Sequence, residues 1–345
     1  MRYSTLPETG IKVSKICLGT MTFGNQNNEQ EGHSQMDLAF DKGVNFFDTA
    51  ELYPVPATAR TQGETERIIG TWFHKSGKRD KVILASKVAG PGDYTAHIRE
   101  NLSFKKEHIN EAVEKSLKRL KTDYIDLYQL HWPERTTNTF GKRGYSHNFN
   151  DNWKENFEDI LNSLNELIIQ GKIRHIGLSN ENPWAVMRFL ELAKKGLPKM
   201  ITIQNPYSLL NRIFEVGNAE ISMRENIGLL AYSPMAFGLL SGKYRNNNFP
   251  SNSRLSLFPN LNRYSSKKCH EATEEYFKIA KKNDLSLTEL SLAFVTDRPF
   301  VTSNIIGATT IEQLEENINT ININLSKEII QEIENVQKVI PDPAP

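Results

Sequence analysis

The sequence has only two cysteines, Cys17 and Cys269, among its 345 residues. Two cysteines make no disulfide framework, and no cysteine or histidine spacing matches a zinc site, so no metal ion is expected. A reducing compartment, the cytoplasm, is the expected location. The sequence also lacks an apolar signal segment and any run near the roughly 18 apolar residues of a membrane span, so a soluble protein without a membrane partner is expected.

An excess of one charge is also absent, because 42 Lys and Arg residues balance 41 Asp and Glu residues. A formal charge of +1 gives no electrostatic reason to expect binding to nucleic acid or to anionic membranes. Hydrophobic residues make up 38% of the chain, which is enough for a full core. No low-complexity linker divides the sequence, so we expect one domain over residues 1–345.

Apolar runs typical of strands alternate with amphipathic helical patterns along the whole chain. Strands are expected at residues 16–20, 44–48, 82–87, 124–131, 173–178, 201–203, 228–231 and 303–306. Helices are expected at residues 33–41, 64–74, 106–120, 157–170, 183–194, 215–225, 288–296 and 327–338. Alternating units of this kind predict an α/β fold, and eight of them favour a closed (β/α)8 TIM barrel.

An open doubly wound sheet is the structural alternative. A sheet of that kind that binds a dinucleotide normally carries Gly-x-Gly-x-x-Gly after an early strand, and this sequence has no such motif. Residues 3–6 and 12–14 flank turn residues and predict an N-terminal β-hairpin that could plug one end of the barrel. Four long polar connections, at residues 54–63, 89–104, 133–153 and 239–268, follow strands and should wall a pocket at the C-terminal face.

Four chemically different side chains lie at or just beyond successive strand ends. Asp48 ends the second strand and Tyr53 follows five residues later, Lys87 ends the third strand, and His131 ends the fourth. Each alone has an ordinary explanation: a helix cap, a half-buried phenol, a surface lysine or a core histidine. Together, an acid, a phenol, an amine and an imidazole at one face of a barrel predict a proton-donating catalytic site.

Seven motifs, in the same order along nearly the whole chain, resemble those of the aldo-keto reductase family. They are Gly19-Thr20-Met21, Asp48-Thr49-Ala50-x-x-Tyr53, Ser86-Lys87, Tyr128-Gln129-Leu130-His131-Trp132, Ile176-Gly177-Leu178-Ser179-Asn180, Gln204-Asn205-Pro206-Tyr207 and Gly307-Ala308-Thr309-Thr310. Within the family the sequence looks most like the bacterial Tas-like branch, which is related to the β subunits of voltage-gated potassium channels.

The resemblance implies a barrel that binds a nicotinamide dinucleotide without a Rossmann motif and reduces small carbonyl substrates. The four strand-end residues then match the catalytic tetrad of the family. Tyr53 would donate the proton, and Lys87 would lower its pKa from the ordinary value of about 10. Asp48 would hold the Lys87 ammonium, and His131 would hydrogen-bond and orient the carbonyl oxygen.

The resemblance also assigns residues to the cofactor. Ser179, Asn180 and Gln204 would bind the nicotinamide carboxamide, and Tyr232 would stack on the nicotinamide ring. The glycine- and hydroxyl-rich segment 233–243 would bind the pyrophosphate. The expected cofactor-binding residues are Thr20, Met21, Asp48, Ser179, Asn180, Gln204, Tyr232, Ser233, Pro234, Met235, Ala236, Lys243, Arg254, Gly307, Thr309, Gln313, Glu316 and Asn317.

The expected cofactor is NADPH, although NADH is not excluded. The turn and helix start after the last strand would take the 2′-phosphate on backbone N–H groups. Many family members carry Arg where this chain has Gln313, and a basic residue in the turn where it has Ala308-Thr309-Thr310. The channel β subunits resemble this chain in having a neutral turn, which favours NADPH binding through Thr309, Gln313 and Asn317, with Glu316 on the adenine.

Two alternatives to a reductase stay open. A regulatory module like the channel β subunits would bind cofactor with slow turnover, but that group typically has Asn where this chain has His131. A Schiff-base aldolase using Lys87 would have no use for Tyr232 or the phosphate turn. The sequence identifies neither the substrate nor the oligomeric state, and a homo-oligomer is possible. Aromatic residues in the connection 133–153 are consistent with a range of aldehydes.

Overall fold

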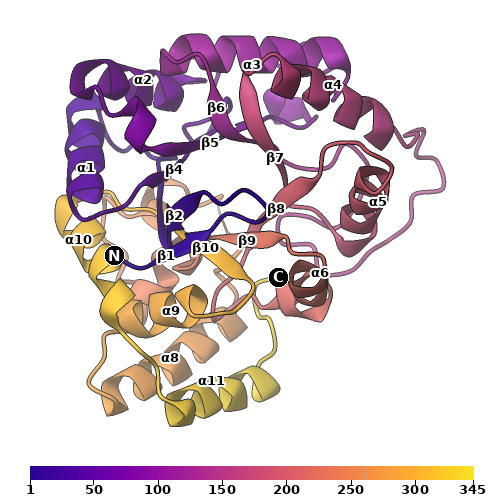
Figure 1. Cartoon of the computed structure of the whole chain (residues 1–345). Helices are drawn as coiled ribbons and strands as arrows, with labels where there is room; N and C mark the ends of the chain where they lie inside the picture. The colour runs from indigo at the N-terminus through magenta and orange to yellow at the C-terminus, as the bar shows by residue number, and fades with distance from the viewer. Residues whose placement is uncertain (261) are drawn as a thin grey trace.

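The protein is described by a computed structural model that covers residues 1–260 and 262–345. Residue 261, inside the expected long connection 239–268, lies outside the described residues. Eight parallel strands close into a barrel in the order β10-β3-β4-β5-β6-β7-β8-β9, and helices surround it (Figure 1). The expected (β/α)8 barrel is therefore confirmed.

The elements alternate along the chain as expected. The barrel strands are β3 (Ile16–Gly19), β4 (Phe46–Asp48), β5 (Ile83–Val88), β6 (Ile125–Leu130), β7 (Ile173–Ser179), β8 (Met200–Pro206), β9 (Gly228–Tyr232) and β10 (Val301–Ile306). The main helices are α1 (Glu29–Asp41), α2 (Glu64–Ser76), α3 (Lys106–Leu120), α4 (Phe157–Ile169), α5 (Pro183–Ala193), α6 (Asn218–Arg224), α8 (Lys267–Lys282), α9 (Leu287–Thr296), α10 (Ile311–Asn319) and α11 (Lys327–Val339). Each helix in the described part of the chain is too short or too polar to cross a bilayer.

An antiparallel hairpin of β1 (Tyr3–Thr5) and β2 (Lys12–Ser14) lies over one opening of the barrel (Figure 1). Leu6 and Val13 of this hairpin region are fully buried and pack on Cys17 and Phe46 inside the barrel. The hairpin therefore closes the N-terminal end, as expected, and leaves the opposite end for the long connections.

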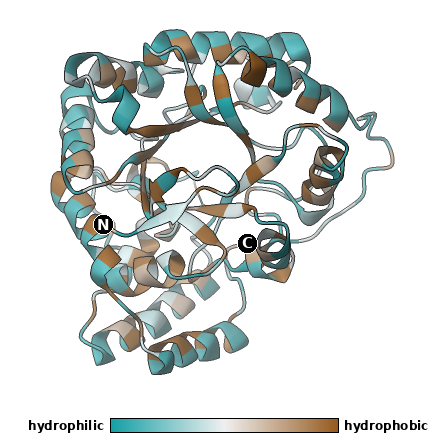
Figure 2. Ribbon diagram, in the orientation of Figure 1, coloured by the Kyte–Doolittle hydropathy of each residue, from teal (hydrophilic) through white to brown (hydrophobic). Residues whose placement is uncertain are grey.

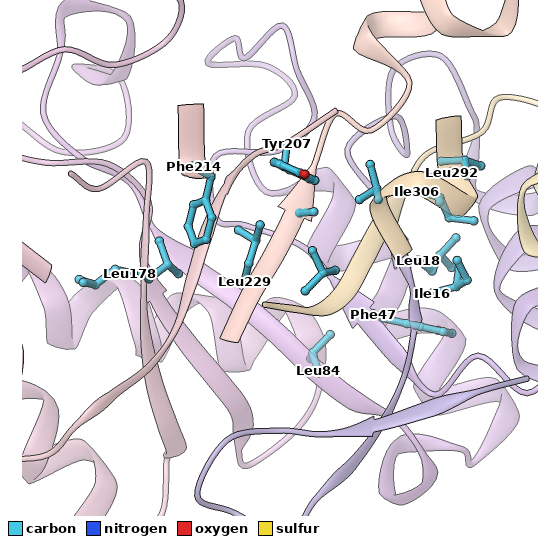
Figure 3. Packing of buried hydrophobic residues seen from close by; sticks show 14 of the residues in the cluster. Ile16, Leu18, Phe47, Leu84, Leu178, Tyr207, Phe214, Leu229, Leu292 and Ile306 are labelled. Carbon is cyan, nitrogen blue, oxygen red and sulfur yellow. The ribbon is translucent and has the colours of Figure 1, made fainter. Parts of the chain in front are cut away.

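The two-residue period of the strands decides which side chains enter the barrel. Phe46 and Ala85 belong to the cluster inside the barrel, whereas Phe47 packs in the layer between strands and helices (Figure 3). Asp48 and Lys87 lie two residues beyond Phe46 and Ala85, so they fall on the inner side at the C-terminal end. The ribbon coloured by hydropathy shows apolar residues on many of the barrel strands and mostly polar residues on the outer surfaces of the helices (Figure 2).

Two helices differ from the expected bounds by more than two residues, each for a local reason. Helix α1 begins at Glu29, four residues earlier than expected, because Asn28 and Glu31 form a capping box. The helix expected at residues 215–225 is divided into a short 3-10 turn, Ile213–Val216, and α6. The division falls at Gly217, whose φ of −141° is not helical.

Helix α8 was not expected from the sequence. It is strongly charged on one face, and Ser266 caps its first turn by accepting a hydrogen bond from the Cys269 N–H. Its buried residues, among them Ala272, Tyr276 and Ile279, recur at helical spacing. It packs against α9 and α11 at one side of the barrel (Figure 1).

Candidate active site

Lys87 lies at the centre of a buried cluster at the C-terminal end of the barrel. Its Nζ atom donates to Asp48 Oδ2 at 2.6 Å, to the main-chain oxygen of Thr49 at 2.7 Å, and to Tyr53 Oη at 3.4 Å. Burial lowers the pKa of Lys87, but Asp48 and Tyr53 raise it, and the net shift is upward. Lys87 therefore stays positively charged although its side chain is closed to solvent.

The phenol of Tyr53 behaves differently from the expectation. Burial raises its pKa, Lys87 lowers it and Asp48 raises it, so the pKa lies above the ordinary value of 10. Lys87 does act in the expected direction, but burial outweighs it, and the expected net decrease is wrong. Since Lys87 is closer to Asp48 than to Tyr53, most of its charge is compensated by the carboxylate.

His131 faces Tyr53 from the end of β6. Their ring centroids are 5.6 Å apart at an interplanar angle of 77°. Burial and the charge of Lys87 hold the pKa of His131 well below 6.5, so the imidazole is neutral near pH 7. Its Nδ1 is buried with no hydrogen-bond partner among the described residues. In the tautomer that carries its proton on Nε2, the neutral imidazole can donate this proton to a group that enters the site.

The second carboxylate oxygen of Asp48 is held by amides from other strands. Gln204 Nε2 donates to Asp48 Oδ1 at 2.8 Å, and Gln129 Nε2 approaches the same oxygen at 3.5 Å. Thr20 Oγ1 donates to the main-chain oxygen of Asp48 at 2.8 Å. Gln129 was part of a family motif, but no role was expected for it; here it helps fix the Asp48 carboxylate.

The residues expected at the nicotinamide form one hydrogen-bonded chain across the barrel mouth. Tyr232 Oη donates to Asn180 Oδ1 at 2.6 Å, and Asn180 Nδ2 donates to the main-chain oxygen of His131 at 2.8 Å. Ser179 Oγ donates to the main-chain oxygen of Gln204 at 2.9 Å. The structure thus brings these four residues beside the Asp48, Tyr53, Lys87 and His131 cluster, as the sequence predicted.

The segment after β9 has an unusual backbone. Ser233, Ala236 and Phe237 have φ angles of 55°, 47° and 56°, followed by Gly238 at 92°. Non-glycine residues in this region are strained and concentrate at functional sites, and successive turns of this kind point N–H groups towards anions. Pro234 and Met235, also expected at the cofactor, lie within the same turn.

Two basic side chains lie near this turn without an acid. Lys243 Nζ is 3.0 Å from the position that a Cβ atom on Gly238 would occupy. Arg254, at the start of the short helix α7 (Arg254–Leu257), lies over the Phe237 ring at 5.2 Å, and burial lowers its pKa. Among the described residues, neither cation forms an ion pair with a carboxylate. Their surroundings suit a bound anion.

The residues expected at the adenosine lie at the start of α10, next to β10. Gln313 Oε1 accepts hydrogen bonds from the Thr309 N–H and hydroxyl, both at 3.1 Å, which leaves the Gln313 amide donor free for another group. Asn317 Nδ2 donates to the main-chain oxygen of Gly307 at 3.3 Å. Glu316 is exposed on the outside of α10.

The mouth of the barrel has an apolar lining that includes Met21, Tyr53 and Trp132. A buried ion pair that the sequence did not predict supports it: Arg99 Nη1 donates to Glu51 Oε1 at 2.9 Å, and the Ala89 N–H donates to the same oxygen at 2.7 Å. This pair ties the connection 89–104 to the turn that carries Tyr53. No linear pattern pointed to Arg99, which is one charged residue within a polar loop.

The described residues contain no group of three or more His, Cys, Asp or Glu side chains that could hold a metal ion.

The model of the aldo/keto reductase family matches residues 15–338. The chain belongs to the aldo/keto reductase family. It is 47% identical to "Protein tas" of Escherichia coli (strain K12), over 100% of both chains. It is 35% identical to "Uncharacterized oxidoreductase YrpG" of Bacillus subtilis (strain 168), over 97% of this chain and 96% of that protein.

One plant relative is named as a channel subunit and not as an oxidoreductase. The chain is 30% identical to "Probable voltage-gated potassium channel subunit beta" of Oryza sativa subsp. japonica, over 99% of this chain and 98% of the relative. The relation to channel β subunits expected from the sequence is therefore confirmed. Membership of the aldo/keto reductase family implies oxidoreductase activity on small carbonyl substrates, and the family generally uses nicotinamide cofactors.

Proposed function

We propose that this protein reduces aldehydes or ketones to alcohols with NADPH. The observation that carries the proposal is the buried Lys87 ammonium between the Asp48 carboxylate and the Tyr53 phenol, with a neutral imidazole, His131, facing Tyr53. A fixed cation beside a phenol stabilises the phenolate that forms when the phenol gives up its proton. A neutral imidazole N–H next to it can bind a carbonyl oxygen.

Each residue then has one role in carbonyl reduction. When bound, NADPH supplies the hydride that the carbonyl carbon accepts. His131 Nε2–H donates to the carbonyl oxygen and orients it towards Tyr53. Tyr53 gives its proton to the oxygen as negative charge develops there, and Lys87 stabilises the resulting phenolate. Asp48 keeps the ammonium in place, and solvent later returns a proton to Tyr53.

The surroundings of the cluster fit the cofactor. Asn180 and Gln204 hold their amide groups beside the cluster, where a carboxamide would exchange with their present partners His131 O and Asp48. Lys243 and Arg254 are two cations available to a pyrophosphate. The free amide donor of Gln313, with the first N–H groups of α10, suits a 2′-phosphate, which favours NADPH over NADH. Because the turn there carries no Arg or Lys, we expect a modest preference.

A binding titration followed by a turnover assay tests the proposal. Protein fluorescence is measured as NADPH and, separately, NADH are added, and the nicotinamide absorbance is then followed after addition of 4-nitrobenzaldehyde. Tighter binding of NADPH, with consumption of NADPH and formation of the alcohol, supports the proposal. Failure of both nucleotides to bind would contradict it.

A second candidate is a cofactor-binding regulatory module with slow turnover. The raised pKa of Tyr53 makes it a weaker acid, and relatives named as probable channel β subunits match nearly the whole chain. Tight NADPH binding without turnover on a broad panel of aldehydes would favour this function. The presence of His131, which can bind the carbonyl oxygen, favours the reductase.

We also infer that residues 1–345 form one cytoplasmic domain. The barrel closes through pairing of β10 with β3, so strands from both ends of the chain are needed for one sheet. Limited proteolysis that releases a stable fragment lacking β10 would contradict the single domain.

A further inference from the structure

Glu51 and Arg99 form a buried ion pair that the proposed reaction does not use. The Glu51 side chain is 0% exposed and that of Arg99 3%. Arg99 Nη1 donates to Glu51 Oε1 at 2.9 Å, and Arg99 Nη2 donates to the other carboxylate oxygen, Oε2. This is the two-bond geometry that orients a guanidinium and a carboxylate most firmly. A buried pair adds little net stability, so stability alone does not account for it.

Glu51 joins the turn after β4 to the end of β5. Its main-chain N–H donates to Lys87 O at 3.2 Å, and the Ala89 N–H donates to Glu51 Oε1 at 2.7 Å. On the other side of the turn, Gln62 Nε2 donates to Glu51 O at 2.6 Å. Both the main chain and the side chain of Glu51 therefore hold the turn against the strand that carries Lys87.

Tyr53 depends on this turn for its position, because it lies five residues beyond the end of β4 and not on a barrel strand. Within the described residues, the only hydrogen-bond contact of Tyr53 Oη is with Lys87 Nζ at 3.4 Å. A contact of this length does not fix the phenol by itself. A reactive side chain on a loop needs support from its surroundings, since a displacement of about 1 Å can lower a rate about 100-fold.

Arg99 supplies a support from outside the turn. It lies in the connection 89–104, and Glu111 of α3 approaches its Nε at 3.5 Å. Leu102 of the same connection belongs to the buried apolar cluster that contains Tyr53. Arg99 therefore connects the Glu51 carboxylate to a helix outside the barrel, and the turn with Tyr53 is held from both sides.

We propose that Glu51 and Arg99 are positioning residues for proton donation, because their pair fixes the turn 49–53 on β5 and thereby holds the Tyr53 phenol beside Lys87. This inference rests on the proposed reductase function. Neither side chain needs to touch the substrate or the cofactor, since both act through the main chain of the turn. Loss of the pair should therefore lower kcat and leave NADPH affinity and the KM for the aldehyde similar to those of the wild type.

The test compares Arg99→Met with Arg79→Met in the reduction of 4-nitrobenzaldehyde, with active sites counted by NADPH titration. Arg79 forms another mostly buried ion pair, with Asp126 at 2.8 Å, but it precedes β5 at the N-terminal end of the barrel. Both variants should lower the Tm. Only Arg99→Met should lower kcat, by about 10- to 100-fold, and Arg99→Lys should restore part of the loss.

The double variant Glu51→Met/Arg99→Met covers the case in which Arg99→Met leaves too little folded protein. It removes both charges, and apolar replacement of a buried pair is often neutral for stability. The turn then lacks its side-chain contacts with Ala89 and Arg99, so kcat should stay low in a protein that is folded.

A second measurement follows Tyr53 itself. In protein labelled with 3-fluorotyrosine, the fluorine NMR signal of Tyr53 is identified by its absence from the spectrum of Tyr53→Phe. This signal should shift or broaden in Arg99→Met and stay unchanged in Arg79→Met. A loss of stability alone would not produce that difference, because both variants lose a buried ion pair.

Three results would overturn the inference without affecting the reductase function: wild-type kcat in Arg99→Met or in the double variant, an equal loss of kcat in Arg79→Met, or an unchanged Tyr53 signal in Arg99→Met. Absence of turnover in the wild type would count against the proposed function instead. The fluorine spectra do not depend on turnover, so they then decide whether the pair positions Tyr53.

Discussion

Lys87 and Asp48 form an ion pair at 2.6 Å in which the Lys87 side chain is 0% exposed and that of Asp48 4%. The carboxylate is held on its other side by Gln204, so the pair has a single favoured geometry. A buried pair of this kind contributes little to stability by itself, since desolvation offsets the attraction between the charges. Lys87 Nζ lies 3.4 Å from Tyr53 Oη, which indicates that the ion pair serves proton donation by the phenol rather than stability.

Replacing Lys87→Met should affect both activity and stability. Turnover should fall about 100-fold or more, because the phenolate of Tyr53 loses its nearby cation. The free energy of unfolding should fall by about 3–5 kcal/mol, because Asp48 is left as a buried charge without a partner. Steady-state kinetics and denaturant unfolding measure the two effects.

The double variant Asp48→Asn/Lys87→Met separates the two roles. It removes the uncompensated charge, so much of the lost stability should return while turnover stays low. Recovery of turnover in the double variant, or wild-type turnover in the single variant, would show that Lys87 has no part in proton donation.

His131 should make the protein sensitive to acid. Burial and Lys87 lower its folded-state pKa well below 6.5, whereas the unfolded chain takes up this proton near pH 6.5. Below that pH the unfolded state binds more protons, so the free energy of unfolding decreases as the pH falls. The Tm of the wild type should fall more steeply between pH 7.5 and about 5 than that of His131→Asn. The pKa of His175 is also lowered, but His175 is present in both proteins, so its contribution to the two slopes is the same. Equal slopes would contradict a buried neutral His131.

Gly238→Ala should weaken NADPH binding. Gly238 has a φ of 92°, and a Cβ atom there would lie 2.7 Å from Lys243 Cε, so the lysine would have to move. The matched control is Gly196→Ala, where φ is 98° but nothing lies within 4 Å of the added Cβ. Both variants strain the backbone, but only Gly238→Ala should lose affinity, by about 10-fold if one charge-assisted hydrogen bond is lost. Similar NADPH affinities for the two variants would contradict this prediction.

The barrel was predictable because each strand is a short apolar run that ends in a polar residue. The two-residue period even places Asp48 and Lys87 on the inner side, beyond Phe46 and Ala85. Helix α8 was missed because no element was assigned to residues 269–287, although Ser266 and the spacing of its buried residues are detectable signals.

Parts of the site depend on distances that the sequence does not contain. The pairing of Arg99 with Glu51 joins two residues 48 positions apart, and neither belongs to a local pattern for that contact. The pKa of Tyr53 was predicted in the wrong direction because the sequence shows which charge lies nearby but not how deeply the phenol is buried. The net pKa shift depends on the balance between burial and Coulomb attraction, which is set only in the folded chain.

The most direct test of the account follows the two hydrogens added to the carbonyl. The protein is incubated with 4-nitrobenzaldehyde and NADPH deuterated at both C4 positions, and the alcohol is analysed by mass spectrometry and quantified over time. The wild type should give 4-nitrobenzyl alcohol with one deuterium on carbon. The Tyr53→Phe variant should bind NADPH with similar affinity, but its rate of product formation should be lower by about 100-fold or more. Product without deuterium, or wild-type rates in Tyr53→Phe, would contradict hydride transfer from the nicotinamide with proton donation by Tyr53.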